Sequence, residues 1–137
     1  MQFFSGAWGE LEWQCVELSM RYLYLAYGVS PYGANGKDVV ANYTTAAGGG
    51  LVKVSNGVAG TKPAPGDVIS FGPTATSTLG HTGVVESVNV DGSGNGSIRI
   101  LSQNDTADGW RTIPVNTWSV NGPATGLGAV SGWLHKP

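Results

Sequence analysis

The order of the predicted elements is the feature that most restricts how this chain can fold. Helical periodicity occurs early, where it predicts a long helix at 10–27 and a short helix near 35–46. Short alternating segments follow, and they predict strands near 51–55, 67–72, 81–90, 97–104, 109–115 and 127–135. Helices that precede strands favour an α+β fold over a parallel α/β sheet, in which the two would alternate.

Glycine-rich turns separate the predicted strands. The chain has 22 glycines, and runs such as 48–50 and 91–96 are typical of tight turns. None of these runs is long enough to serve as an interdomain linker. With 137 residues, of which 41% are hydrophobic, we expect one domain over 1–137 with a single core.

The long predicted helix carries the only cysteine of the chain. Its apolar face is formed by Val16, Met20, Leu23 and Tyr27. Gly28 is a plausible stop. If the helix begins near Trp13, the sulfur of Cys15 lies beside unpaired backbone N–H groups, which favour thiolate over thiol. The alternative is a buried structural cysteine that packs against Tyr22 and Leu25.

A histidine begins the strand predicted at 81–90, and the strand predicted at 97–104 returns beside it after a turn at 91–96. A register symmetric about this turn pairs Val88 with Ser97. The same register pairs His81 with Asn104 and puts their Cβ atoms about 5 Å apart on one side of the sheet. Ser102 is then expected on that side as well.

The amide oxygen of Asn104 could hold one ring nitrogen of His81 and fix the imidazole in a single tautomer. A cysteine nucleophile, a histidine base and an orienting amide are together sufficient for nucleophilic catalysis, so Cys15, His81 and Asn104 are the candidate catalytic residues. The alternative is that both polar residues serve turn chemistry alone. A slip of one residue in the register would separate them.

Several sequence blocks, in order along nearly the whole chain, resemble the CHAP family, the cysteine, histidine-dependent amidohydrolases and peptidases. The blocks are Trp13-Gln14-Cys15-Val16-Glu17-Leu18 with Arg21-Tyr22, Asn35-Gly36-Lys37-Asp38, Pro63-Ala64-Pro65-Gly66-Asp67-Val68-Ile69-Ser70-Phe71, Gly80-His81 with Val84-Val85-Glu86-Ser87-Val88, Gln103-Asn104, and Val130-Ser131-Gly132-Trp133-Leu134-His135.

The resemblance implies a compact papain-like α+β fold, with N-terminal helices packed on an antiparallel sheet of about five to six strands. It also implies cleavage of an amide bond in peptidoglycan, either as an N-acetylmuramoyl-L-alanine amidase or as a peptide-bridge endopeptidase. Cys15 and His81 fall on the catalytic motifs of the family, and Asn104 matches its third position. Members often carry glutamate two residues before that asparagine, where this chain has Ser102. We expect Asn104 alone to orient His81.

Further residues are candidates for the oxyanion site or for substrate binding. The backbone N–H of Cys15 is the natural first oxyanion donor, and Gln14 is a candidate for a second. Trp13 and Trp110 are the best candidates among the five tryptophans for lining a substrate groove, although core packing is the commoner role of tryptophan. Ser102 is a further candidate for the oxyanion site or for substrate binding.

Charge and composition exclude several other classes of function. The formal net charge is −2, and 12% of residues are charged, so there is no basic stripe for nucleic acid. No apolar stretch is long enough to span a bilayer. No metal site is expected, because His81 and His135 lie far apart and no calcium-loop spacing occurs. We expect no cofactor and a monomer.

The expected partner is a stem or bridge peptide of bacterial peptidoglycan. Residues 1–4 lack the basic start and apolar length of a secretory signal, and the expected location is extracellular or at the cell wall, by secretion or phage release. Two other functions stay open. One is a catalytically silent wall-binding module, which the serine at position 102 makes conceivable. The other is a CHAP-like amidase on a small thiol or polyamine conjugate.

Overall fold

The computed structural model describes residues 15–30, 32–75, 78, 80–102 and 109–137, with the backbone alone for 15–17. Helix α1 (Cys15–Tyr27) is followed by the short helices η1 (Gly36–Asp38), α2 (Val39–Asn42) and η2 (Thr45–Ala47). The long helix is therefore confirmed over its described part, whereas the single helix predicted near 35–46 is divided into three short pieces. A further short helix, η3 (Gly122–Thr125), precedes the last strand.

Gly28 ends α1 as the sequence predicts. Its φ of +72° is in the left-handed region, where glycine has no steric penalty. Its N–H donates to the carbonyl oxygen of Tyr24 at 2.9 Å, which satisfies one of the open carbonyls at the end of the helix. The chain can then turn away from the helix axis.

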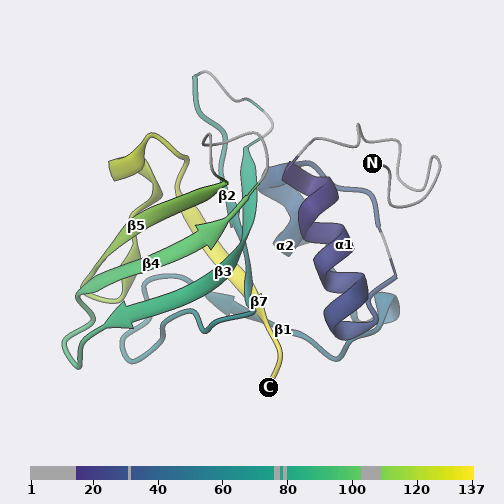
Figure 1. Ribbon diagram of the computed structural model, residues 1–137, viewed down its shortest axis with the longest axis horizontal. Helices are drawn as coiled ribbons and strands as arrows, with labels where there is room; N and C mark the ends of the chain where they lie inside the picture. Colours follow the sequence, from purple (N-terminus) through teal and green to yellow (C-terminus); the bar gives the residue numbers. More distant parts are fainter. Residues whose placement is uncertain (1–14, 31, 76–77, 79, 103–108) are drawn as a thin grey trace.

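The strands form one antiparallel sheet in the order β1-β7-β2-β3-β4-β5-β6 (Figure 1). Their bounds are β1 Val52–Ser55, β2 Val68–Phe71, β3 His81–Val90, β4 Gly96–Leu101, β5 Trp110–Asn116, β6 Ser119–Val120 and β7 Val130–His135. The last strand, β7, lies between β1 and β2 and is therefore an interior strand of the sheet. β6, a strand of two residues, was not predicted.

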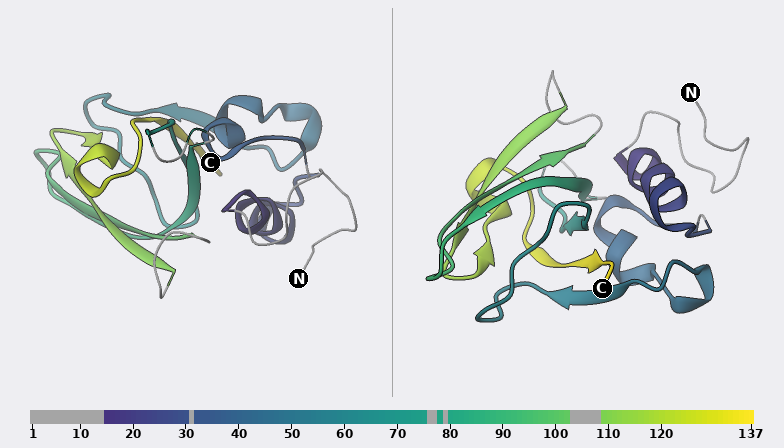
Figure 2. Two further views of the ribbon diagram at one scale, coloured as in Figure 1. Left: turned by 90° about the horizontal axis from the view of Figure 1, so that it is seen from above. Right: turned by 60° about the horizontal axis from the view of Figure 1, so that its bottom comes forward.

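The two faces of the sheet contribute to two hydrophobic clusters. Val68 and its neighbour Ile69 in β2 point to opposite faces, as alternation in a strand requires. The first cluster lies under the helices and includes Met20, Leu23, Val39, Val68, Val84 and Leu134. The second lies within the curl of the sheet and includes Ile69, Phe71, Ile98, Ile100, Ile113 and Trp133. Figure 2 shows the curled sheet with α1 beside it.

The turn of the β3–β4 hairpin differs from the predicted one. Val90 pairs with Gly96, which leaves a loop of 91–95. The carboxylate of Asp91 accepts hydrogen bonds from the N–H groups of Ser93 at 2.9 Å and Asn95 at 3.0 Å. These bonds close the loop one residue later than the symmetric register requires.

The predicted pairing of Val88 with Ser97 is therefore wrong, because Val88 pairs with Ile98. A register shift between Val85 and Ser87 then adds one residue to β3. Beyond this bulge, Val84 pairs with Leu101, which is the offset that the sequence predicted. The longer loop shifts the pairing by one residue and the bulge shifts it back. Near the start of β3 the pairing therefore has the predicted offset.

Candidate active site

α1 supplies the first candidate residue. The described part of the helix begins at Cys15, and the N–H groups of a first helical turn have no partners within the helix. The side chain of Cys15 lies outside the described residues, as do Trp13 and Gln14. Their predicted roles stay predictions.

Two buried hydroxyl groups join α1 to β3. Ser19 Oγ lies 3.1 Å from Thr82 Oγ1, and the hydroxyl of Thr82 donates to the carbonyl oxygen of Ile69 at 2.8 Å. Because the Thr82 proton is used in that bond, Ser19 is the donor to Thr82. Positions four residues apart share a face of an α-helix, so the face that includes positions 15 and 19 is directed toward the start of β3. Figure 1 shows the beginnings of α1 and β3 at the same end of the molecule.

His81 is the first residue of β3. It pairs with Phe71 of β2, and the two ring centroids are 5.9 Å apart. Its side chain is half-buried, and its Nε2 atom is shielded from solvent. Since Thr82 faces α1, alternation directs His81 to the side of Phe71, at the rim where the strand begins.

Close backbone contacts fix the position of His81. A Cβ atom on Gly36 would lie 2.8 Å from both the Cα and the N atom of His81. Gly80 has a φ of +73°, and a Cβ atom there would lie 2.4 Å from the carbonyl oxygen of Phe71 and 2.5 Å from Cβ of Lys37. Only glycine fits at these two positions, so η1 packs directly against the start of β3.

The third candidate position is described in part. Ser102 is buried, and its N–H donates to the carbonyl oxygen of Gly109 at 2.9 Å. A Cβ atom on Gly83, opposite in the neighbouring strand, would lie 3.3 Å from Cβ of Ser102. Asn104 lies outside the described residues. Its pairing with His81 and its orienting role stay predictions.

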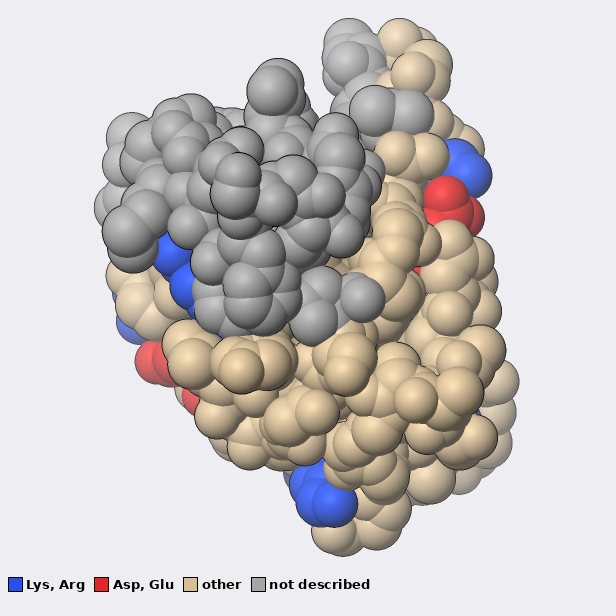
Figure 3. Space-filling model, turned by 90° about the vertical axis from the view of Figure 1, so that its right-hand side faces the viewer, with Lys and Arg blue, Asp and Glu red and all other residues tan. Residues whose placement is uncertain are grey.

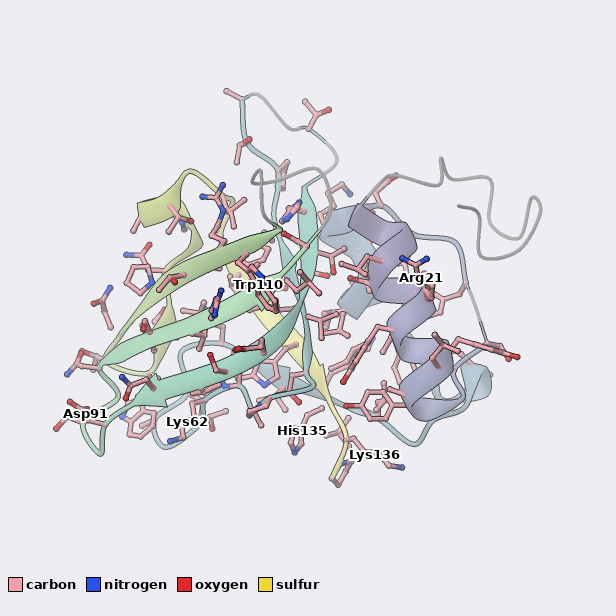
Figure 4. The ribbon with its side chains drawn as sticks, in the orientation of Figure 1. Arg21, Lys62, Asp91, Trp110, His135 and Lys136 are labelled. Carbon is pink, nitrogen blue, oxygen red and sulfur yellow. The ribbon has the colours of Figure 1, made fainter. Side chains whose placement is uncertain are left out.

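Trp110, a predicted groove residue, is the first residue of β5. It is partly exposed and does not belong to either hydrophobic cluster. The guanidinium of Arg99 lies over its ring, with Cζ 4.4 Å from the centroid. Figure 4 shows Trp110 on the sheet between β5 and α1. Its position agrees with a surface role better than with a core role.

A second histidine, which is partly exposed, pairs with the buried carboxylate of Asp67, and the sequence patterns did not identify this pair. His135 Nδ1 lies 2.7 Å from the Asp67 carboxylate, which also accepts the N–H of Ala64 at 2.8 Å. Burial raises the pKa of Asp67, while the bonds to Ala64 and His135 act in the opposite direction. The pair joins the start of β2 to the end of β7, so its role is structural.

The same turn is also bonded to α1. The hydroxyl of Tyr27 donates to the carbonyl oxygen of Gly66 at 2.8 Å, and burial raises the pKa of this phenol. The block 63–71, for which the sequence showed only a family resemblance, therefore joins β2 to β7 and to α1. It was the sequence signal that could have pointed to the Asp67–His135 pair.

A pocket of about 270 Å³ lies where residues of β6 and the end of β5 meet Asn56 and the start of β7. It is lined by Asn56, Asn116, Ser119, Val120, Asn121, Pro123, Ala129 and Val130. The amide of Asn56 is bonded to the backbone of Val120 and Val130, so this side chain holds the strands together. The candidate catalytic residues do not line this pocket.

The fold is that of a papain-like α+β protein. N-terminal helices pack on a curled antiparallel sheet, α1 contacts β3 through buried hydroxyls, and a histidine begins β3. The chain belongs to the CHAP domain family, whose model matches residues 6–104, more than half of the sequence. The predicted family and fold class are confirmed. CHAP domains are cysteine, histidine-dependent amidohydrolases and peptidases.

A solved structure supports the fold. The chain is similar to the crystal structure of Ly7917 with the hydrolyzing product of MDP, with a TM-score of 0.58 and 21% sequence identity. The similarity covers 90% of this chain and 53% of that one, so this chain spans about half of its length. No match was found among curated protein sequences.

Neither a membrane span nor a metal cluster occurs in the described residues. Within them, no helix has the length and apolar character needed to cross a membrane. In this part of the chain, no three His, Cys, Asp or Glu side chains gather as metal ligands would.

Proposed function

We propose that this chain hydrolyses an amide bond of peptidoglycan, with Cys15 as nucleophile and His81 as general base and acid. The observation that carries the proposal is the Ser19–Thr82 contact. It directs the face of α1 on which Cys15 lies toward the start of β3, where His81 lies at the rim of the sheet with its side chain on the face opposite to that of Thr82. Membership of the CHAP family supports the same chemistry.

The reaction follows from these positions. The Cys15 thiolate attacks the carbonyl carbon of the amide, and the oxyanion forms near the N–H groups of the first turn of α1. Protonated His81 gives its proton to the leaving amine as the C–N bond breaks. His81 then takes a proton from water, which attacks the thioester and releases Cys15 and the carboxylic acid.

Asn104 is the proposed orienting residue. An amide oxygen that accepts from one ring nitrogen of His81 leaves the other nitrogen for the thiol. Ser102, at the position where related domains often have a carboxylate, cannot stabilise the imidazolium by charge. The burial of Ser102 agrees with a packing role beside the site.

The proposed substrates are the muramoyl–L-alanine bond or a bond of the peptide bridge. The structure of Ly7917 was solved with the hydrolyzing product of MDP, which supports a peptidoglycan fragment as the substrate. The similarity covers only 53% of that chain. Such a substrate occurs at the cell wall, which is the proposed location. Gln14, Trp13 and Trp110 are proposed to bind the substrate beside Cys15.

The test uses purified cell walls and synthetic muramyl dipeptide. The wild-type protein is expected to reduce wall turbidity and to release a new amine, whereas Cys15→Ala and His81→Ala are expected to lose at least about a thousandfold in rate. Cys15→Ser is the conservative control. Equal rates for the wild type and Cys15→Ala, or no cleavage by the wild type, would contradict the proposal. Mass spectrometry of the fragments separates amidase from endopeptidase.

A wall-binding module without catalysis is the second candidate, and the serine at position 102 is the observation that favours it. Such a module would sediment with walls without releasing fragments. Fragments that depend on Cys15 would exclude it.

A further inference from the structure

We propose that the pocket beside β6, to which Asn116, Ser119 and Asn121 contribute polar side chains, is a second binding site that holds one uncharged sugar unit of a wall glycan. The β6 pocket is formed by β5, β6, η3, the start of β7 and the segment after β1. The wall glycan as the source of the sugar rests on the proposed function, whereas the chemistry of the ligand follows from the lining of the pocket.

Three polar side chains of the β6 pocket are available to a ligand. Within the described part of the chain, the side chains of Asn116 and Ser119 have no hydrogen-bond partner. The amide oxygen of Asn121 accepts the N–H of Ala124 at 3.2 Å, which leaves the NH2 group of Asn121 for a ligand. Amides and a hydroxyl offer both donors and acceptors, which is what the hydroxyl groups of a sugar require.

The rest of the lining indicates a small ligand without charge. Among the described residues that line the pocket, none is charged, so an ionic ligand would lose its hydration without gaining a counter-charge. Pockets for drug-sized ligands have volumes of about 300–1,000 Å³, so a volume of about 270 Å³ suits one sugar ring. Four apolar side chains can contact the C–H groups of such a ring, namely Val120, Pro123, Ala129 and Val130.

One side chain connects three of the segments that form the β6 pocket. The amide of Asn56 donates to the carbonyl oxygens of Val120 at 3.2 Å and Val130 at 3.0 Å, and it accepts the N–H of Val120 at 2.9 Å. These bonds join the segment after β1 to β6 and β7. The pocket is therefore formed in advance, and a ligand pays little for ordering it.

The turn between two of the lining residues has a strained backbone. Asn116 pairs with Ser119, so Thr117 and Trp118 form a two-residue turn. Their φ angles are +48° and +68°, values for which such turns ordinarily have asparagine and glycine. The N–H of Thr117 donates to the side chain of Asn95 at 2.9 Å, and that of Trp118 donates to a carbonyl of the same loop at 2.9 Å. Strain held in this way concentrates at ligand sites, and here it fixes the two polar residues that flank the turn.

The β6 pocket and the candidate catalytic residues lie on different sides of the molecule. Figures 1 and 2 show η3 on the side away from α1. Figure 3 looks onto the α1 side, where the charged side chains of the described residues are few and well separated, so charge does not favour attachment to the wall there. A glycan strand has many sugar units, and one of them can occupy the pocket while a stem peptide of the same wall reaches Cys15.

The experiment titrates the wild-type protein with the neutral trimer of N-acetylglucosamine and follows the backbone N–H signals by NMR. A shallow site for one sugar ring binds weakly, so we expect a dissociation constant of about 1 mM. The signals of Asn116, Ser119 and Asn121 should shift. The deacetylated trimer, whose amines are cationic, should bind at least about tenfold more weakly, because the described lining has no counter-charge for it.

Two substitutions remove ligand contacts and keep the bonds that support the pocket. Ser119→Ala deletes the hydroxyl, and Asn121→Asp keeps the oxygen that accepts from Ala124 but loses the NH2 donors. The double variant should raise the dissociation constant for the neutral trimer at least about tenfold. Ser97→Ala is the matched control, because Ser97 lies in β4 outside the pocket and should leave this constant unchanged. Circular dichroism checks that each variant is folded.

Attachment is measured separately from catalysis. The double variant should clear cell walls at least about threefold more slowly than the wild type, yet cleave soluble muramyl dipeptide at the same rate. An equal loss on both substrates would overturn the inference. So would no trimer binding by the wild type, shifts confined to α1 and β3, equal binding of the cationic trimer, or unchanged affinity in the double variant. If the wild type cleaves neither substrate, the proposed function fails, and the trimer titration still decides whether the pocket binds sugar.

Discussion

Gly80 determines where His81 lies, because its backbone has the positive φ that other residues avoid and its α-carbon is enclosed by Phe71 and Lys37. Gly80→Ala is expected to lower the free energy of unfolding by about 3 kcal/mol or more, through backbone strain and a clash with main-chain atoms. The measurement is urea denaturation followed by circular dichroism.

Gly57→Ala is the matched control. Gly57 has a φ of +84°, but a Cβ atom added there would have no heavy atom within 4 Å, so only the strain is added. We expect a loss of about 1 kcal/mol. Equal losses at the two positions would show that close packing around Gly80 does not fix the start of β3.

Asp67 should give the protein a pH-dependent stability. Burial raises its pKa above the ordinary value of 3.8, so the folded state binds the Asp67 proton more tightly than the unfolded state does. The stabilisation from this group is complete below pH 3.8 and is lost as the pH rises through the raised pKa of the folded state. Asp67→Asn is expected to remove this part of the slope.

The measurement for Asp67 is the free energy of unfolding from pH 3.5 upward, in about half-unit steps, for both proteins. Asparagine keeps an oxygen for the N–H of Ala64, so the turn should remain closed. A wild-type slope that persists unchanged in Asp67→Asn would assign the pH dependence to other groups.

At the scale of single elements, the hydroxyl pair between α1 and β3 is the link on which the proposed site depends. Ser19→Ala removes a donor from a buried contact, while Thr82 keeps its bond to Ile69, so we expect a loss of about 1 kcal/mol. In a double-mutant cycle with Thr82→Val, the coupling energy should also be about 1 kcal/mol. Urea denaturation of the four proteins gives this value, and additive losses would contradict the contact.

The sequence predicted the long helix and six of the strands, because periodicity and glycine turns mark them well. It did not predict the bulge at Glu86, since nothing in an alternating segment distinguishes an extra residue from a regular one. β6 was missed for a similar reason: its two residues are too few for any periodic signal.

The candidate catalytic residues and the contacts around them depend on different kinds of signal. Cys15 and His81 were proposed from residue type and position, and their catalytic roles stay predictions. The Ser19–Thr82 contact and the Asp67–His135 pair depend on residues 63 and 68 positions apart, which no local pattern reveals. Trp110 was predicted as a groove residue, but its partner Arg99 was not, because their contact requires the β4–β5 register.

At the scale of the whole molecule, both hydrophobic clusters depend on one sheet. Val68 contributes to the first and Ile69 to the second, so loss of β2 would remove support from both. A single cooperative unit is the expected consequence, and the single-domain organisation stays a prediction.

Substitutions in each cluster test this cooperativity. Leu23→Ala in the first cluster and Ile100→Ala in the second should each lower the free energy of unfolding by about 2–5 kcal/mol. In both variants, tryptophan fluorescence and far-ultraviolet circular dichroism should report the same midpoint. Two separate midpoints would indicate that the helical layer and the curled sheet unfold independently.

The central claim is that the thiol of Cys15 is activated by His81, and the pH dependence of its alkylation measures this most directly. Cys15 is the only cysteine, so the mass increase with iodoacetamide reports on one site. We predict half-maximal reactivity well below about pH 8.5 in the wild type, and a shift toward that ordinary thiol value in His81→Gln. Identical profiles for the two proteins, both near the ordinary thiol value, would contradict the account.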